Sequence, residues 1–150
     1  MKCAHLMTTE IFCCLPTDSL EEVASVMQSE DIGPVPIVGD LESRNLIGIV
    51  TDRDIALRAV ARGLDARRTS AEEVMTRELV TCGAEDDIDS ALDLMARHQV
   101  RRLPIVDGGS RLVGMISQAD VATRLNESAK IAEVVEEISR PRTASSWVDR

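Results

Sequence analysis

The feature that most constrains this chain is an internal repeat. The segment Gly48-Ile49-Val50-Thr51-Asp52-Arg53-Asp54 returns as Gly114-Met115-Ile116-Ser117-Gln118-Ala119-Asp120, and each position of the second copy is numbered 66 higher than its counterpart. Glycine, two apolar residues, a hydroxyl residue and an aspartate keep the same spacing in both copies. Such self-similarity predicts two related half-domains, which is also compatible with a length of 150 residues.

Each copy of the motif follows the same predicted order of elements, which is strand, helix, strand, strand and helix. The two first helices carry matching apolar stripes with helical spacing: Leu20, Val23, Ala24 and Met27, then Ile88, Ala91, Leu92 and Met95. Residues 11–13 and 79–81 are predicted as the short strands that open the halves. Pro36 and Pro104 lie in the next apolar runs, and because proline lacks a backbone N–H these runs are predicted as edge strands or strand starts.

The repeat also predicts the limits of the parts. The first repeat is expected over residues 7–63 and the second over 75–126, each entered through a Met-Thr turn. Between them, residues 64–74 form a linker and a short helix, which starts at a capping box in Ser70-Ala71-Glu72-Glu73. A C-terminal helix over 127–139 and a mobile tail over 140–150 complete the chain.

Composition excludes several classes of function. The net charge of −9 and the presence of only two aromatic residues, Phe12 and Trp147, argue against a nucleic-acid-binding protein. No apolar run approaches the roughly 18 residues of a membrane span, so a cytoplasmic protein without a membrane partner is expected. Four cysteines lack zinc-finger spacing, which predicts reduced, buried thiols and no metal site.

The paired motif has a chemistry of its own. Unpaired amides at the start of a helix favour a phosphate, and Thr51 or Ser117 would add a hydroxyl group. Asp54 or Asp120 can accept hydrogen bonds from two vicinal hydroxyls, as acidic residues do when they bind ribose. Phosphate and diol together suggest a nucleotide. The alternative is purely structural, with the hydroxyl residues as N-caps and the aspartates facing the positive helix end.

Two further segments complete a family pattern. With Asp31-Ile32-Gly33-Pro34-Val35-Pro36-Ile37 and His98-Gln99-Val100-Arg101-Arg102-Leu103-Pro104-Ile105 ahead of them, the motifs resemble a tandem pair of CBS domains, the Bateman module. The chain is similar to the small stand-alone pairs of the hypoxic-response-protein type. The resemblance implies an α/β (α+β) fold of two β-α-β-β-α CBS repeats, packed by pseudo-two-fold symmetry through their sheets.

The resemblance also implies ligands and residue roles. Clefts for adenosine-containing ligands such as AMP, ADP, ATP, NAD or S-adenosylmethionine are expected, together with a homodimer. Carried onto matching positions, Asp54 and Asp120 would hold ribose, and Thr51 and Ser117 would contact phosphate or ribose. The backbone around Cys13 and Thr81 would meet adenine.

The arginines distinguish the two halves. Arg101 and Arg102 could clamp a phosphate, whereas the first half has Gly33-Pro34 at those positions. Arg53 has no counterpart in the second motif and partly compensates. The alternative for all three arginines is a solvated surface or an ion pair with one of the many carboxylates.

The sequence therefore predicts a regulatory sensor that needs no cofactor, binds an adenine nucleotide and signals by a conformational change to a separate, unknown partner protein. It predicts no enzyme, because a nucleophile, a base and an orienting group are not found together. The alternative is a stress-response interaction protein without nucleotide affinity, which acts through its surface or through cysteine or metal chemistry. A small enzyme is a third, weaker hypothesis.

Overall fold

The computed structural model describes residues 1–124 and 128–139, and the side chains of residue 124 and of 128–132 are not described. The predicted tail over 140–150 and the predicted end of the second repeat at residue 126 lie outside the described residues. Contacts divide the chain into two compact units. The unit named here the Thr51 unit consists of residues 10–79 and 106–112, and the Ser117 unit consists of residues 1–9, 80–105 and those from 113 onward.

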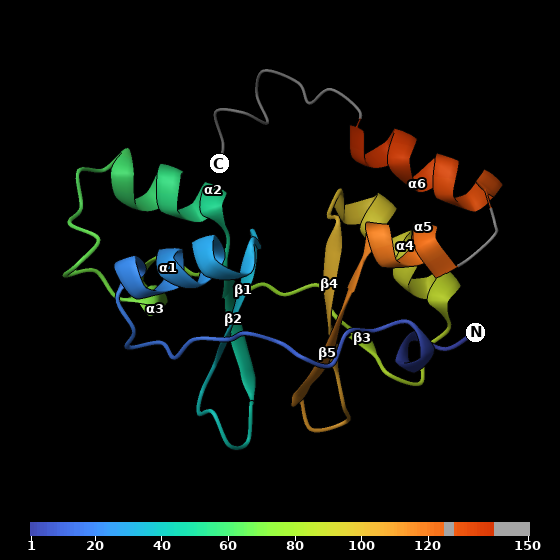
Figure 1. Ribbon diagram of the computed structural model, residues 1–150, viewed down its shortest axis with the longest axis horizontal. Helices are drawn as coiled ribbons and strands as arrows, with labels where there is room; N and C mark the ends of the chain where they lie inside the picture. The colour runs from blue at the N-terminus through green and yellow to red at the C-terminus, as the bar shows by residue number, and fades with distance from the viewer. Residues whose placement is uncertain (125–127, 140–150) are drawn as a thin grey trace. The chain divides into compact units, whose positions relative to one another are not determined.

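The Thr51 unit contains a two-stranded antiparallel sheet with helices before and after it (Figure 1). Its elements are α1 (Leu20–Glu30), β1 (Val35–Val38), β2 (Leu46–Val50), α2 (Asp52–Ile55), the π-helical turn η2 (Ala56–Val60) and α3 (Ala71–Val74). In the sheet, Pro36 stands opposite Ile49 and Ile37 stands opposite Gly48. This register places the second strand directly ahead of Thr51.

The Ser117 unit is organised around a sheet with the strand order β3-β4-β5. Its elements are η1 (Cys3–His5), β3 (Cys82–Gly83), α4 (Ile88–His98), β4 (Arg102–Val106), β5 (Leu112–Ser117), α5 (Gln118–Arg124) and α6 (Ser128–Ser139). The sixth helix packs against α4 and α5. Together with the Thr51 unit, these elements confirm the predicted mixed class of helices and strands.

Local sequence signals set the helix ends. Ser19 and Glu22 form a reciprocal capping box at the start of α1. The predicted capping box at the start of α3 is confirmed, because Glu73 accepts the backbone N–H of Ser70 at 2.6 Å. Helices α1 and α4 end at Asp31 and Gln99, whose φ angles of 52° and 55° are left-handed and stop the helix.

Each unit has its own apolar core. The predicted stripe of α4 is fully confirmed, because Ile88, Ala91, Leu92 and Met95 are all buried. The predicted stripe of α1 is only partly correct: Leu20 and Val23 are buried, Met27 is half-buried, and Ala24 is exposed. Helix α1 covers only a two-stranded sheet, whereas α4 is itself covered by α6, so α1 buries a narrower face than α4.

Two strand predictions are wrong. Residues 11–13 and 79–81 form no strand. The backbone pairing begins one residue after each predicted strand ends, at the Cys14–Ile37 bridge and at Cys82 of β3. Pro104 is not on an edge, since β4 is the middle strand of its sheet. A proline is tolerated there because β3 is only two residues long and demands few donors from its neighbour.

The Met-Thr turns do not lie where the sequence order suggests. The first nine residues belong to the Ser117 unit, where the amides of Cys3 and Ala4 donate to the carbonyls of Asp86 and Ala84, each at 2.8 Å. Figure 1 shows this N-terminal segment beside β3. Residues 71–76 belong to the Thr51 unit. Each Met-Thr segment therefore packs on the motif strand of the other repeat.

Candidate functional site

In the Thr51 unit, the motif residues form a reciprocal pair. The hydroxyl oxygen of Thr51 accepts the backbone N–H of Asp54 at 3.1 Å, and the carboxylate Oδ2 of Asp54 accepts the backbone N–H of Thr51 at 2.9 Å. Thr51 is the N-cap of α2, with extended backbone angles. The structural alternative considered from the sequence is therefore realised, because this is a capping box.

The Ser117 unit repeats this geometry. The hydroxyl of Ser117 accepts the N–H of Asp120 at 3.0 Å, and Oδ2 of Asp120 accepts the N–H of Ser117 at 3.1 Å. In both units the capping box uses only one oxygen of the carboxylate. The second oxygen, Oδ1, can still accept hydrogen bonds from a ligand, so capping and ligand binding are compatible.

Asp54 has neighbours that the sequence did not reveal. Its side chain is 13% exposed, and both carboxylate oxygens lie 3.5 Å from the hydroxyl of Thr76. The Arg58 Nε lies 3.8 Å from Oδ1 of Asp54, while a terminal nitrogen of Arg58 donates to the carbonyls of Val74 and Met75 at 3.2 and 3.4 Å. Arg58 thus connects the motif aspartate to the end of α3. The four-residue spacing of Asp54 and Arg58 is a sequence signal for their ion pair. The carbonyl partners of Arg58 lie 16 and 17 residues away and have no such signal.

A methionine crosses each motif glycine. A Cβ placed on Gly48 would lie 2.5 Å from the sulfur of Met75, and one placed on Gly114 would lie 2.5 Å from the sulfur of Met7. The threonine after each methionine pairs with the same strand. Thr76 exchanges two backbone hydrogen bonds with Ile49, and Thr8 exchanges two with Met115.

The three predicted arginines are exposed. Arg101 is attached to the motif through its backbone, because its carbonyl accepts the N–H of Gln118 at 2.8 Å. Within residues 1–124 and 128–139, neither Arg101 nor Arg102 forms an ion pair with a carboxylate, so the ion-pair alternative is not realised for them there. Arg53 follows Asp52, whose Oδ1 accepts the Arg53 backbone N–H at 3.1 Å.

The two residues predicted near adenine lie beside the strand starts. Cys13 is half-buried, and its pKa is raised by burial against the opposing effect of Arg44. Thr81 is half-buried and immediately precedes β3. Across the described side chains, no hydrogen bond or ion pair joins Cys13 or Thr81 to the motif residues. Their role toward adenine stays a prediction.

The cysteines are free thiols. Burial, and then the neighbouring Cys82 and Asp86, raise the pKa of Cys3 to about 12, and burial followed by Asp18 raises that of Cys14 to about 11. The Cys3 and Cys82 thiols interact in the core of the Ser117 unit. In the part of the chain with described side chains, no group of three or more histidine, cysteine, aspartate or glutamate residues is placed to hold a metal ion.

No helix in the described ranges is both long enough and apolar enough to cross a membrane.

Comparison with known proteins gives a consistent result. The chain matches the CBS domain twice, over residues 3–60 and 71–127. The CBS domain-containing protein YhcV of Bacillus subtilis is 43% identical over 125 residues, which cover 82% of this chain and 86% of YhcV. The predicted resemblance is thereby confirmed.

Two solved structures are also similar. The crystal structure of Hypoxic Response Protein I with two coordinated zinc ions has a TM-score of 0.75 and 35% identity, and the match covers 83% of this chain and 99% of that protein. The CBS domain pair of protein MJ0100, in complex with 5′-methylthioadenosine and S-adenosyl-L-methionine, has a TM-score of 0.71 and 26% identity. That match covers 82% of this chain and 94% of the pair.

Proposed function

Because this chain belongs to the CBS-domain family and carries two copies of the domain, we propose that it is a regulatory sensor of adenosine-containing ligands rather than an enzyme. The observation that carries the proposal is the duplicated capping box. Each box fixes an aspartate in one rotamer and leaves one carboxylate oxygen available. A preorganised acceptor of this kind lowers the entropy that ligand binding would otherwise cost.

The ribose is the group that these aspartates recognise best. Oδ1 of Asp54 and Oδ1 of Asp120 would each accept a hydrogen bond from a ribose hydroxyl, while Oδ2 stays in its capping box. Thr51 and Ser117 would donate their hydroxyl hydrogens toward ribose or phosphate, since their oxygens already accept a backbone N–H. The complex of the MJ0100 pair with two adenosine derivatives supports this ligand class.

A signal would leave the Thr51 unit through contacts already present. A ligand that draws on Oδ1 of Asp54 competes with Arg58 and Thr76, and these residues are attached to α3 and to the segment ahead of the second repeat. The signal requires that the ligand bind one arrangement of this segment more tightly than another. The proposed output is a separate partner protein in the cytoplasm, contacted by a homodimer of this chain.

A second candidate rests on one specific observation. Hypoxic Response Protein I has been solved with two coordinated zinc ions. In this chain, metal or thiol chemistry would draw on the interacting pair Cys3 and Cys82. A structural zinc site takes four protein ligands, and the described side chains do not place even a third beside the pair. The sensor is therefore the better-supported proposal.

The deciding experiment uses nucleotide-stripped, full-length protein. Thermal unfolding and calorimetric titration are measured with AMP, ADP, ATP, NAD, S-adenosylmethionine and 5′-methylthioadenosine, with Zn²⁺ in parallel. A saturable rise in melting temperature that agrees with the calorimetric Kd supports the sensor. A rise with Zn²⁺ alone, blocked by thiol alkylation, supports the second candidate and contradicts the first.

A further inference from the structure

The charges beside the two capping boxes have opposite signs. The repeat alignment matches Gly33 and Pro34 of the first half with Arg101 and Arg102 of the second, and it matches Asp52 with Gln118. The first half thus combines two neutral residues with the carboxylate of Asp52. The second half combines two cationic residues with the neutral side chain of Gln118. Asp52 and Gln118 each precede by two residues the aspartate proposed to hold ribose.

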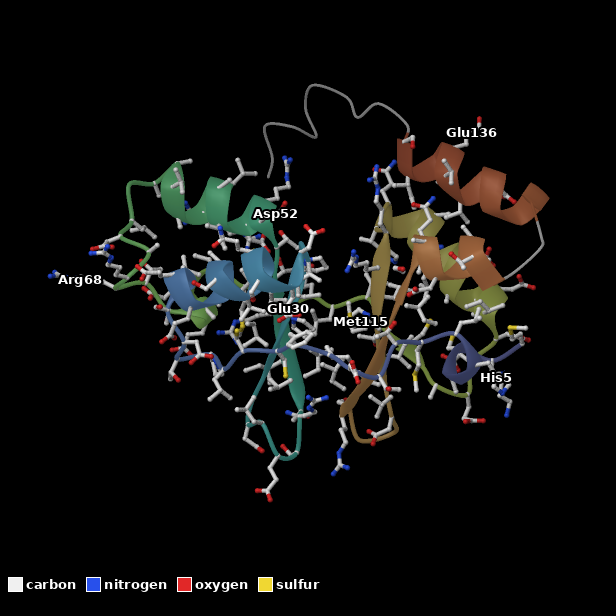
Figure 2. All side chains as sticks on the ribbon, in the orientation of Figure 1. His5, Glu30, Asp52, Arg68, Met115 and Glu136 are labelled. Atoms are coloured by element: carbon white, nitrogen blue, oxygen red, sulfur yellow. The ribbon has the colours of Figure 1, made fainter. Side chains whose placement is uncertain are left out.

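In the Thr51 unit, the negative charge is close to the neutral pair. A Cβ on Gly33 would lie 3.5 Å from Oδ1 of Asp52, so the Asp52 carboxylate occupies the space beside this glycine. Figure 2 shows Asp52 at the start of α2. Its only partner among the described residues is the backbone N–H of Arg53. No cationic side chain within the described ranges neutralises Asp52.

In the Ser117 unit, the corresponding space is positive. The hydrogen bond from the Gln118 N–H to the Arg101 carbonyl holds the arginine pair beside the start of α5, two residues before Asp120. Gln118 is neutral, and Asp120 engages Ser117 through its capping box. Both arginine side chains are exposed and can turn toward a ligand bound at Asp120.

Arg53 and Arg58 do not cancel this difference. Arg53 follows Asp52 in the sequence, but among the described residues no ion pair joins the two side chains. Arg58 is already directed to Asp54 and to the carbonyls at the end of α3. The second motif has no acidic residue at position 118 or 119, so Asp120 is the only carboxylate within that motif.

We propose that the two repeats divide adenosine ligands by the charge of the 5′ group. The Ser117 unit takes ligands with a 5′-phosphate, because planar guanidinium groups pair with phosphate. The Thr51 unit takes ligands whose 5′ group is uncharged or cationic, such as a thioether or a sulfonium, because Asp52 repels phosphate. The inference rests on the proposed adenosine-binding function and specifies the ligand class of each site.

The first test uses proteins with a single intact site. Asp54→Asn should weaken the Thr51 site about tenfold and leave the Ser117 site intact, and Asp120→Asn should do the reverse, while asparagine can still cap the helix. AMP and 5′-methylthioadenosine are titrated calorimetrically, since they share adenosine and differ in 5′ charge. The Ser117 site is expected to prefer AMP by about tenfold or more, the worth of one charge-assisted hydrogen bond, and the Thr51 site is expected to prefer 5′-methylthioadenosine.

The second test exchanges the charges. In the protein with only the Thr51 site, Gly33→Arg with Asp52→Gln should raise AMP affinity about tenfold. The new Cβ at position 33 meets only ordinary contacts and the residue has no positive φ, so the change is sterically allowed. In the protein with only the Ser117 site, Arg101→Gly with Gln118→Asp should lower AMP affinity similarly. Arg62→Gln, on an exposed residue outside both boxes, controls for a change of net charge.

The outcomes separate the two proposals. If neither single-site protein nor the parent binds any adenosine ligand, the adenosine sensor itself is wrong. If ligands bind but both sites rank AMP and 5′-methylthioadenosine in the same order, the division by charge is wrong while the sensor stands. Preferences that reverse between the sites and follow the exchanged charges support the inference.

Discussion

The two motif glycines are explained by what lies against them. Met75 crosses Gly48 and Met7 crosses Gly114, and in each case the sulfur lies 2.5 Å from the position that a β-carbon would take. The carbonyl oxygen of Thr76 would also lie 3.2 Å from a Cβ on Gly48, whereas the three atoms nearest to a Cβ on Gly114 all belong to the side chain of Met7. Backbone yields less readily than a methionine side chain, so Gly48 is the less replaceable of the two.

This comparison gives a prediction for stability. Gly48→Ala and Gly114→Ala should each lower the free energy of unfolding by about 1–3 kcal/mol, the usual cost of overpacking, with the larger loss at position 48. Urea denaturation measures both. Gly108→Ala is the matched control, because nothing lies within 4 Å of its added Cβ. A loss at Gly108 equal to that at Gly48 would contradict the steric explanation.

The motif aspartates have two roles that mutation can separate. Asp120→Asn keeps an oxygen to accept the Ser117 N–H but removes the charge, so it should weaken ribose binding about tenfold and leave thermal stability nearly unchanged. Asp120→Ala should also destabilise the protein by about 1 kcal/mol through loss of the cap. Calorimetry and thermal unfolding of both variants test this. Equal ligand affinity in Asp120→Asn and the parent would remove Asp120 from the site.

At the residue scale, the sequence predicted what local spacing determines. Thr51 and Asp54 are three residues apart, and a capping box follows directly from that spacing. Thr76 was not predicted as a neighbour of Asp54, because the two are 22 residues apart and meet only after the chain returns. Whether Arg101 and Arg102 form ion pairs could not be predicted from the sequence either, because ion pairs depend on which residues meet in the folded chain.

At the scale of elements, residues 74–76 at the end of α3 are held by contacts with Arg58 and with β2. Arg58 donates to two carbonyls at the end of this short helix, and Thr76 pairs with Ile49 of β2. A four-residue helix has little stability of its own, so these contacts determine whether it forms. The segment is therefore a suitable element for transmitting a ligand's effect.

Arg58→Gln should loosen this segment selectively. Loss of the charged hydrogen bonds is expected to cost about 1 kcal/mol, given that the side chain is 43% exposed, and to speed amide exchange at Ile49 and Thr76. Hydrogen exchange followed by mass spectrometry or NMR measures this. Arg62→Gln, in the exposed turn that follows η2, should leave those amides unchanged. Equal exchange in both variants would show that Arg58 does not hold the segment.

Elements were predicted correctly where the side-chain pattern in the sequence was strong. The stripe of α4 and the capping box of α3 follow from side-chain pattern alone. The strand starts were displaced because Cys14 and Cys82 pair through backbone groups, which apolar pattern does not report. The crossing of residues 1–9 to the other unit was also beyond sequence pattern, since it arises from long-range backbone hydrogen bonds.

At the scale of the whole molecule, buried thiols are distributed over both cores. Cys3 and Cys82 lie in the core of the Ser117 unit, and Cys14 lies in that of the Thr51 unit. Burial raises the pKa of all three above the ordinary value of 9.0, to about 12 for Cys3 and about 11 for Cys14. At neutral pH the thiols are protonated in both the folded and the unfolded chain, so they leave stability independent of pH there.

The dependence appears at alkaline pH, and its sign follows from proton counting. Above pH 9 the unfolded chain releases thiol protons that the folded chain retains, so the free energy of unfolding falls as pH rises toward about 11–12. Each buried thiol contributes a slope of up to about 1.4 kcal/mol per pH unit in that window. Urea denaturation between pH 8 and 11.5 measures the slope.

Single variants then assign the slope to particular thiols. Cys3→Ala and Cys14→Ala should each flatten the alkaline slope, even if either lowers stability at every pH by leaving a small cavity. Cys13→Ala is the matched comparison, because Cys13 is only half-buried and its raised pKa is opposed by Arg44, so it should change the slope less. Alkaline slopes that are identical in all three variants would mean that other groups, such as the lysines, carry the dependence. Because these thiols lie in different cores, the double variant should reduce the slope by the sum of the two single reductions, and a smaller reduction would mean that the two titrations are coupled.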